Sequence, residues 1–261
     1  KMKKKLLMAV IMGCVLVPFM LSGATAKTLK IGSMSPLTGP YASDGTDIKN
    51  GVLTAIEVFE QSGGIPGYEK IEFYPQDTAC DPKQAVAVAN HMVHKGVIFV
   101  AGHFCSGASI PASDVYAEEG ILQISPGSTN PKLTDRGLDN VFRTCGRDDQ
   151  QGAVAGNYIA DHFADANIAM LHDKTAYGKG LVDETMKQLR ARGKEETMYE
   201  PYTQGDKDFT ALVTKMKAAR IGLIFIGGYH QDVGLIARQT HDQNLDAVVM
   251  SGDAVVNQEY W

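Results

Sequence analysis

Short apolar runs alternate with amphipathic stretches along the chain from Lys27 onward. Apolar positions that recur every three or four residues are typical of helices that cover a sheet, and short apolar runs are typical of buried strands. Strands are expected at residues 28–33, 71–75, 97–101, 121–124, 168–172, 196–199, 223–227 and 247–250. Helices are expected at residues 47–61, 82–94, 111–118, 150–163, 180–192, 208–218 and 231–241. This alternation predicts an α/β fold with parallel sheets and crossover helices.

The start of one predicted helix has a clear capping sequence. Asp81 is placed to cap the helix, Pro82 suits the first turn, and Gln84 completes a capping box. Residues 126–146, rich in Pro, Gly, Asn, Thr and Asp, interrupt the alternation. We therefore expect two doubly wound lobes joined by a hinge, the first spanning residues 27–147 and the second residues 148–261.

The two ends of the chain indicate a piece of a longer reading frame. The first residue is Lys rather than Met, and the chain stops at Trp261, just after a predicted strand with no helix to cover it. We expect the second lobe to be incomplete, with the C-terminal part and its return to the first lobe absent.

Residues 1–26 have the pattern of a secretory signal peptide. Four Lys residues precede an apolar run from Leu6 to Leu21, and small residues follow up to Ala26. A transmembrane anchor is the alternative, but the run is short and is interrupted by Pro18. We expect cleavage after Ala26 and a periplasmic mature protein.

Charge and composition exclude several classes of partner. The formal net charge of the chain is −5, and removing residues 1–26 takes away four Lys and no acidic residue. A large basic stripe is therefore not expected, which argues against nucleic acid as a partner. The 44% apolar content is ample for a buried core. We expect a monomer.

Three cysteines remain after processing: Cys80, Cys105 and Cys145. Export to an oxidising compartment favours a disulfide, and the odd number leaves one thiol over. Cys80 and Cys105 are the expected pair, because each lies at the edge of a predicted element in the same half of the chain. Cys145 is then a small buried residue or, alternatively, a reactive thiol.

Candidate binding residues lie in the loops that follow the predicted strands. In open parallel sheets, ligands bind beyond the carboxyl ends of the strands, where loops and helix N-termini present free N–H groups. Hydroxyl and aromatic side chains dominate these loops, which span residues 102–107, 125–129, 173–177, 227–230 and 251–253. Asp253 is the most plausible carboxylate.

A free amino acid requires this set of groups. Its carboxylate needs several O–H or N–H donors, for which Ser106 and Thr129 are suited, and its ammonium needs an anion, for which Asp253 is suited. Tyr177 and Tyr229 could close over the ligand. Each residue also has an ordinary structural reading: Ser106 as a helix N-cap, Thr129 as a turn former, Asp253 as a loop acid, and the tyrosines as the rim of a core. Only their convergence on one sheet edge favours a binding site.

Several motifs resemble the branched-chain amino-acid (Leu/Ile/Val) binding proteins of bacterial ABC transporters. The most extensive is Asp77–Asn90, and the others are Gly102–Ser106, Pro111–Asp114, Glu119–Leu122, His172–Lys174, Gly205–Phe209 and Gly227–His230. The resemblance covers nearly everything from Lys27 to Asp253. It implies a type I periplasmic-binding fold, in which two lobes close around a leucine-like ligand, and a membrane permease as partner. No cofactor and no enzymatic activity are implied.

The resemblance also implies roles for particular residues. The disulfide of the family corresponds to Cys80 and Cys105, and its ligand-binding residues correspond to Ser106, Gly127, Ser128, Thr129, Tyr177, Tyr229 and Asp253. Phe104, Asp44 and Cys105 are expected at the side-chain pocket. The chain departs from the family in having Asp253 in place of Glu, Phe104 in place of a smaller aliphatic residue, and Asp44 in place of an aromatic one. A polar or smaller amino acid therefore stays open as the ligand.

An enzyme and a ligand-sensing domain are the alternative classes of function. For an enzyme, Ser106 and His103 suggest a nucleophile and a base, but there is no G-x-S-x-G elbow and no evident orienting acid. His91 and His94 lack a third metal ligand at a recognisable spacing, so no metal is expected. A ligand-sensing domain for amides or other small molecules on the same fold is the remaining alternative.

Overall fold

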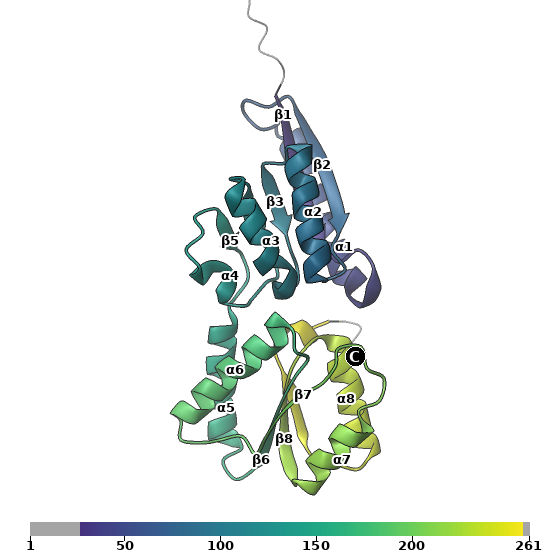
Figure 1. Cartoon of the computed structure of the whole chain (residues 1–261), viewed down its shortest axis with the longest axis vertical. Coiled ribbons are helices and arrows are strands. Elements are labelled where there is room, and N and C mark those ends of the chain that lie inside the picture. Colours follow the sequence, from purple (N-terminus) through teal and green to yellow (C-terminus); the bar gives the residue numbers. More distant parts are fainter. Residues whose placement is uncertain (1–26, 258–261) are drawn as a thin grey trace, which may run out of the picture.

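A computed structural model describes residues 27–257, and the predicted signal peptide lies outside this range. The described chain forms two parallel sheets, one above the other in Figure 1. We call the part that contains β1–β5 the first lobe and the part that contains β6–β9 the second lobe. Within the described residues, no helix is both long and apolar enough to span a bilayer.

The first lobe contains a five-stranded sheet with the order β2-β1-β3-β4-β5, in which all neighbouring strands are parallel. Its strands are β1 (Thr28–Ser35), β2 (Lys70–Asp77), β3 (Phe99–Gly102), β4 (Leu122–Ser125) and β5 (Val141–Arg143). Its helices are η1 (Gly39–Tyr41), α1 (Ala42–Gln61), α2 (Pro82–Lys95), α3 (Ser106–Glu118) and α4 (Lys132–Asp135).

Helices cover both faces of this sheet because successive strand residues point to opposite sides. Val100 is fully buried on the face that Met92 of α2 covers, where both side chains approach Gly32. Phe99 and Ala101 point to the other face, toward α1, where an apolar groove of about 550 Å³ lies between the helix and the sheet.

The second lobe contains a four-stranded parallel sheet with the order β7-β6-β8-β9. Its strands are β6 (Asn167–His172), β7 (Met198–Pro201), β8 (Ile221–Gly227) and β9 (Val248–Ser251), and its helices are α5 (Asp148–His162), α6 (Ala176–Ala191), α7 (Thr210–Ala218), α8 (His230–Asp242) and η2 (Asp253–Val255). Figure 1 shows α5 and α6 on one side of the sheet and α7 and α8 on the other. The run Leu223–Gly227 is buried throughout, as expected for a central strand with both faces covered.

The structure corrects several sequence-based expectations. The segment 126–146 is not wholly irregular, because it contains α4 and β5, which are too short to show a period. Helix α3 begins at Ser106 rather than at Pro111, because small residues such as Ala108 and Ala112 fill its buried face and give little amphipathic signal. Helix α1 begins at Ala42 rather than at residue 47, and α6 begins at Ala176 rather than at residue 180. A further correction concerns the capping box at α2.

Asp81 caps α2 as predicted, since its Oδ1 accepts a hydrogen bond from the Gln84 N–H at 2.7 Å. Gln84 does not return a bond to the backbone of Asp81. Its Nε2 donates instead to the carbonyl of Asp77 at 2.8 Å, because the Asp81 N–H is already bonded to the carbonyl of Thr78. The side chain therefore ties the helix start to the end of β2.

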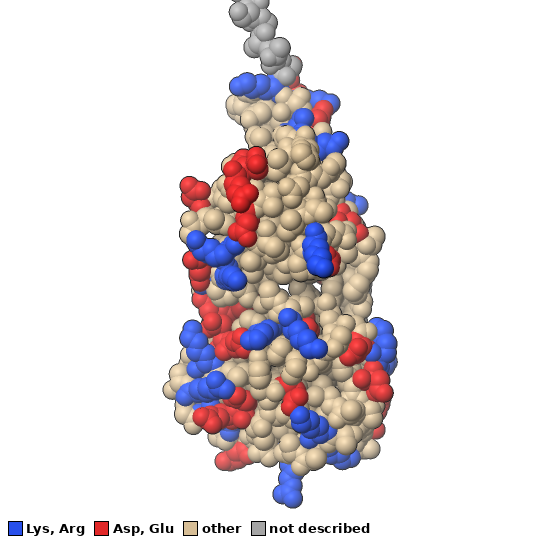
Figure 2. Space-filling model, viewed as in Figure 1, with Lys and Arg blue, Asp and Glu red and all other residues tan. Residues whose placement is uncertain are grey.

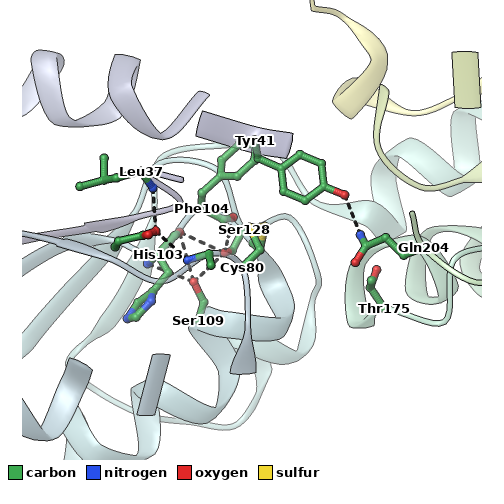
Figure 3. Close-up of a disulfide and its surroundings, with 12 residues drawn as sticks. Leu37, Tyr41, Cys80, His103, Phe104, Ser109, Ser128, Thr175 and Gln204 are labelled. Atoms are coloured by element: carbon green, nitrogen blue, oxygen red, sulfur yellow. Dashed lines mark hydrogen bonds between the residues drawn. A yellow bond between two sulfur atoms is a disulfide. The ribbon is translucent and has the colours of Figure 1, made fainter. Parts of the chain in front are cut away.

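The predicted disulfide between Cys80 and Cys105 is present, with the two Cα atoms 5.5 Å apart. Cys80 lies in the turn before α2 and Cys105 is the N-cap residue of α3, so the bond joins the starts of two neighbouring helices (Figure 3). It anchors the loop after β3 to the loop after β2.

Removal of this disulfide is expected to lower the free energy of unfolding. Closing a loop of 25 residues contributes roughly 3.5 kcal/mol through the entropy of the unfolded chain. We expect a loss of about 2–4 kcal/mol in the double variant Cys80→Ala/Cys105→Ala, measured by urea denaturation, with Cys145→Ala as the control. A loss under about 1 kcal/mol would contradict a constraining role for the bond.

Candidate functional site

A cavity of about 240 Å³ lies between the two lobes. The first lobe contributes Asp44, Phe104, Ser106, Pro126, Gly127 and Cys145, and the second contributes Tyr177, Tyr229, Asp253, Ala254, Val256 and Asn257. Most of these residues follow the carboxyl ends of β3, β4, β6, β8 and β9. The space-filling view shows the hollow between the lobes, with acidic and basic side chains intermingled over the surrounding face (Figure 2).

The structure brings together seven of the ten residues predicted for the site. Ser106, Gly127, Tyr177, Tyr229, Asp253, Phe104 and Asp44 all line the cavity. Ser128, Thr129 and Cys105 are not among the lining residues. Their ligand contacts, like those of the seven, stay predictions.

The three residues outside the lining have structural contacts of their own. Ser128 is buried, and its hydroxyl lies 2.6 Å from that of Ser109 and donates to the Phe104 carbonyl at 2.8 Å. Thr129 is buried too, and its carbonyl accepts the Asp148 N–H at 3.0 Å. Cys105 is in the disulfide and lines a second pocket, which shares Tyr229 with the first.

Ser106 is the first residue of α3 rather than its N-cap. Its hydroxyl oxygen accepts a hydrogen bond from the Asn130 N–H at 3.2 Å. This contact leaves the hydroxyl proton for donation into the cavity. The neighbouring wall requires glycine at position 127, because a Cβ there would lie 2.6 Å from the Phe104 ring.

Asp253 lies on the opposite wall, in η2 directly after β9. The Tyr177 O–H donates to its Oδ1 at 2.9 Å. Gln151 holds the same residue at two points, since its Nε2 donates to Oδ1 at 3.1 Å and its Oε1 accepts the backbone N–H at 3.0 Å. Asp253 is exposed to solvent, so its carboxylate is accessible to a ligand.

Aromatic rings form the wall between these groups. The Tyr229 ring lies 5.1 Å from that of Tyr177 and 6.3 Å from that of Phe104, measured between centroids. Burial raises the pKa of both tyrosines well above its usual value. Both phenols therefore stay protonated at physiological pH, and that of Tyr177 donates to Asp253.

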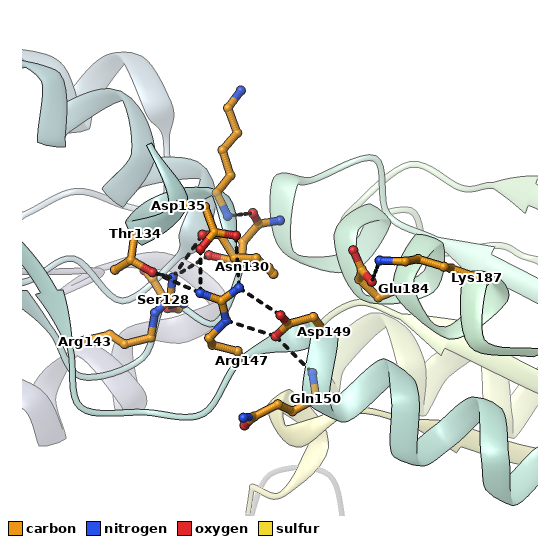
Figure 4. A network of polar contacts seen from close by, with 12 residues as sticks. Ser128, Asn130, Thr134, Asp135, Arg143, Arg147, Asp149, Gln150, Glu184 and Lys187 are labelled. Carbon is orange, nitrogen blue, oxygen red and sulfur yellow. Dashed lines mark hydrogen bonds and ion pairs between the residues drawn. The ribbon is translucent and has the colours of Figure 1, made fainter. Parts of the chain in front are cut away.

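An arginine network holds the loop that carries the first-lobe wall (Figure 4). Arg143 donates to the carbonyls of Ser128 and Asn130 at 2.6 and 2.8 Å. Arg147 pairs with Asp135 at 2.7 Å and with Asp149 at 2.8 Å, and so ties α4 to the start of α5. The chain crosses from one lobe to the other at this network.

Sequence reasoning missed Asp148, a fully buried acid in the first turn of α5. Its Oδ1 accepts the Gln151 Nε2 at 3.4 Å, so one amide joins it to Asp253. Burial raises the pKa of Asp148 to about 7, and the negative charge of Asp253 adds to this effect. The sequence gives no signal for it, because the run Arg147–Asp149 is typical of an exposed helix start.

The two candidate catalytic residues, Ser106 and His103, are not bonded to each other. His103 is fully buried, and its Nε2 lies 3.0 Å from the Tyr116 hydroxyl. Burial lowers its pKa to about 3. Ser106 is bonded to Asn130 instead. Over residues 27–257, no cluster of three or more His, Cys, Asp or Glu residues is arranged to hold a metal ion.

The fold and the interlobe cavity together define a two-lobed binding protein. The model of the family described as "Periplasmic binding protein" matches residues 28–258, so the chain belongs to this family. The resemblance deduced from the sequence motifs is thereby confirmed.

Curated relatives give the same result. The chain is 53% identical over 237 residues to "Leu/Ile/Val-binding protein homolog 1" of Brucella suis, a match that covers 91% of this chain and 64% of the relative. It is 49% identical to "Leu/Ile/Val-binding protein homolog 2" of Brucella abortus, covering 99% of this chain and 68% of that protein. The chain thus spans about two thirds of the length of these relatives.

Solved structures share the fold. The substrate-binding protein LivJ of Streptococcus pneumoniae, in complex with isoleucine, superposes with a TM-score of 0.79 at 30% identity, covering 90% of this chain and 66% of that one. A solute-binding protein of Rhodopseudomonas palustris in complex with 3,4-dihydroxybenzoic acid superposes with a TM-score of 0.75 at 22% identity, covering 87% and 62%. The second match concerns the fold alone.

The raised pKa of Asp148 predicts a pH-dependent stability. Because the folded-state pKa lies above the unfolded value, the stabilisation is present at low pH and is lost as the pH rises through about 7. Between about pH 5.5 and pH 8 the wild type should lose about 2 kcal/mol through this group. Asp148→Asn should remove this loss, measured by urea denaturation at both pH values. Asp165→Asn, at an exposed site after α5, should not.

Proposed function

We propose that the protein is an extracytoplasmic solute-binding protein that captures an amino acid and delivers it to an ABC permease by closure of its lobes. One observation carries this proposal: the hydroxyl of Ser106 lies on one wall of the cavity, and the carboxylate of Asp253 lies on the other. An amino acid carries one anionic and one cationic group a few bonds apart, and these match the two walls.

The carboxylate of the ligand would bind to the first lobe. Ser106 offers its hydroxyl proton, whereas the N–H groups of Gly127 and Ser128 already donate to the Ser125 hydroxyl oxygen at 3.3 and 2.9 Å. None of the described lining residues is basic. Neutral hydrogen-bond donors would therefore stabilise the anion, as helix N-termini and loops do in other proteins. Thr129 retains its predicted role as a further donor.

The ammonium would bind to Asp253, with Tyr177 holding the same carboxylate oxygen. Asp253 is one methylene shorter than the Glu of the family, and the two-point contact with Gln151 fixes its backbone and carboxylate together. The closed form is favoured because the ligand contacts this group only when the lobes approach each other.

The side chain of the ligand would contact Phe104, Pro126 and Val256. Two relatives named as Leu/Ile/Val-binding proteins, at 53% and 49% identity, favour a branched-chain amino acid. Asp44, which accepts a hydrogen bond from Asn257 at 2.9 Å, supports the alternative of a smaller or polar amino acid. A ligand-sensing role for amides or other small molecules on the same fold is the runner-up, and the names of these relatives argue against it.

We further propose that the mature protein is periplasmic and monomeric, with residues 1–26 removed as a signal peptide. Membership of the periplasmic binding protein family supports the location.

Thermal-shift measurements on the full-length mature protein, with each of the twenty amino acids, test the proposed function. A ligand at about 100 times its Kd adds about 2.7 kcal/mol to the free energy of unfolding, so it raises the melting temperature. We expect stabilisation by Leu, Ile and Val. Asp253→Asn should remove most of it, whereas Asp165→Asn should leave it unchanged; an unaltered response in Asp253→Asn would exclude that residue from the site.

The proposed processing has its own test. Intact-mass spectrometry of the protein recovered from the periplasm of an expressing bacterium should give a chain that begins at Lys27. Ala26→Leu should block cleavage, because the peptidase requires a small residue before the cut. A mature chain with another first residue would move the predicted cleavage site.

A further inference from the structure

Tyr41 belongs to the first lobe but is buried against the second. It is the last residue of η1, directly before α1, and only 4% of it is exposed. Its ring centroid lies 4.5 Å from that of Tyr229 and 6.0 Å from that of His230. Its hydroxyl accepts a hydrogen bond from the Gln204 Nε2 at 2.7 Å, the contact across the gap in Figure 3.

The residue before Tyr41 is held across the same gap. The carbonyl of Pro40 accepts a hydrogen bond from the Gln231 Nε2 at 3.0 Å. Gln204 lies in the loop between β7 and α7, and Gln231 lies in the first turn of α8. Two separate elements of the second lobe therefore hold one short segment of the first.

Tyr41 does not line the cavity, whereas its partner Tyr229 does. Tyr229 also contacts Tyr177 and Phe104 through its ring, so it joins the Tyr41 contact to the cavity wall. Other contacts between the lobes are closer to the ligand site: the Asp44 that bonds to Asn257 lines the cavity itself. Tyr41 therefore bridges the lobes without reaching the ligand space.

We infer that Tyr41, together with Gln204 and Gln231, forms an interlobe latch that stabilises the closed form and raises the affinity for every ligand by the same factor. This inference rests on the proposed function as a binding protein that closes. The three residues act as positioning residues, because none of them lines the cavity.

The factor follows from the two-state equilibrium between open and closed forms. When the unliganded protein is mainly open, a variant that destabilises the closed form lowers the closed population by some factor. The apparent Kd of each ligand then rises by the same factor. An aromatic pair and a neutral hydrogen bond together are worth about a factor of ten in such an equilibrium. A residue that touched the ligand would instead change the affinities of different ligands by different factors.

Calorimetric titration of the full-length mature protein with leucine, isoleucine and valine tests the first half of the inference. Tyr41→Ala should raise all three Kd values by the same factor of about ten, and stopped-flow measurements should place the change in the dissociation rate. Tyr41→Phe keeps the ring and should cost about threefold. Tyr158→Ala, an exposed tyrosine of α5, is the matched control and should change nothing.

A double-mutant cycle separates the latch from a general loss of folding. If the hydroxyl of Tyr41 acts through Gln204, then adding Gln204→Ala to Tyr41→Phe should cause no further loss. Both variants should unfold at the wild-type urea midpoint without ligand. Additive losses, or factors that differ between leucine and valine, would overturn the inference.

A trapping experiment reports on closure without any ligand. The Asn130 Nδ2 donates to the Ala176 carbonyl across the lobes at 2.7 Å, so Asn130→Cys/Ala176→Cys, in a Cys145→Ser background, should cross-link only when the lobes close. The rate of cross-linking under copper-phenanthroline, followed on non-reducing gels, is proportional to the closed population.

Tyr41→Ala should slow this trapping by the same factor of about ten, whichever solute the protein binds. An unchanged trapping rate would overturn the latch. If the wild-type protein is cross-linked but binds none of the amino acids, the proposed ligand class is contradicted. Slower cross-linking of Tyr41→Ala would still support the latch.

Discussion

Parallel pairing is the constraint on which this structure depends. In a parallel sheet all strands deliver their following loops to one edge. The loops after β3 and β4 in the first lobe and after β6, β8 and β9 in the second lobe meet at one cavity, although their residues span positions 104–257. The crossover helices that parallel pairing requires bury both faces of each sheet, which leaves the strand ends as the place where polar groups are free to face a ligand.

The cavity divides its chemistry between the lobes. The first lobe presents the Ser106 hydroxyl and the loop at Gly127, which the disulfide and Arg143 hold in place from outside. The second lobe presents Asp253, held by Tyr177 and Gln151. Ser106 and Asp253, the groups proposed for the two charged ends of a zwitterion, lie on opposite walls. A binding protein with this arrangement gains its full set of ligand contacts only on closure, which is how a small molecule can shift the equilibrium between two forms.

Two residues outside the cavity, Tyr41 and Asp148, also bear on closure and stability. Tyr41 bridges the lobes beside the ligand space, and Asp148 lies buried beneath it with a pKa near 7. An interlobe contact such as that of Tyr41 changes the equilibrium between the open and closed forms. It does not change which ligand fits the cavity. The residues that contact the ligand then determine specificity, so affinity and specificity are carried by different residues of one fold.

The sequence alone determined the alternation of strands and helices, the Asp81 cap and the Cys80–Cys105 pair, because each follows from local periodicity, local backbone chemistry or the edges of predicted elements. It also placed Ser106 and Asp253 at strand ends, and their convergence follows from parallel topology. Only the tertiary structure showed that Thr129 is not among the residues that line the cavity, that Asp148 is buried, and that Tyr41 contacts the other lobe. Burial and interlobe contact depend on which elements lie side by side in space, and neither leaves a periodic trace along the chain.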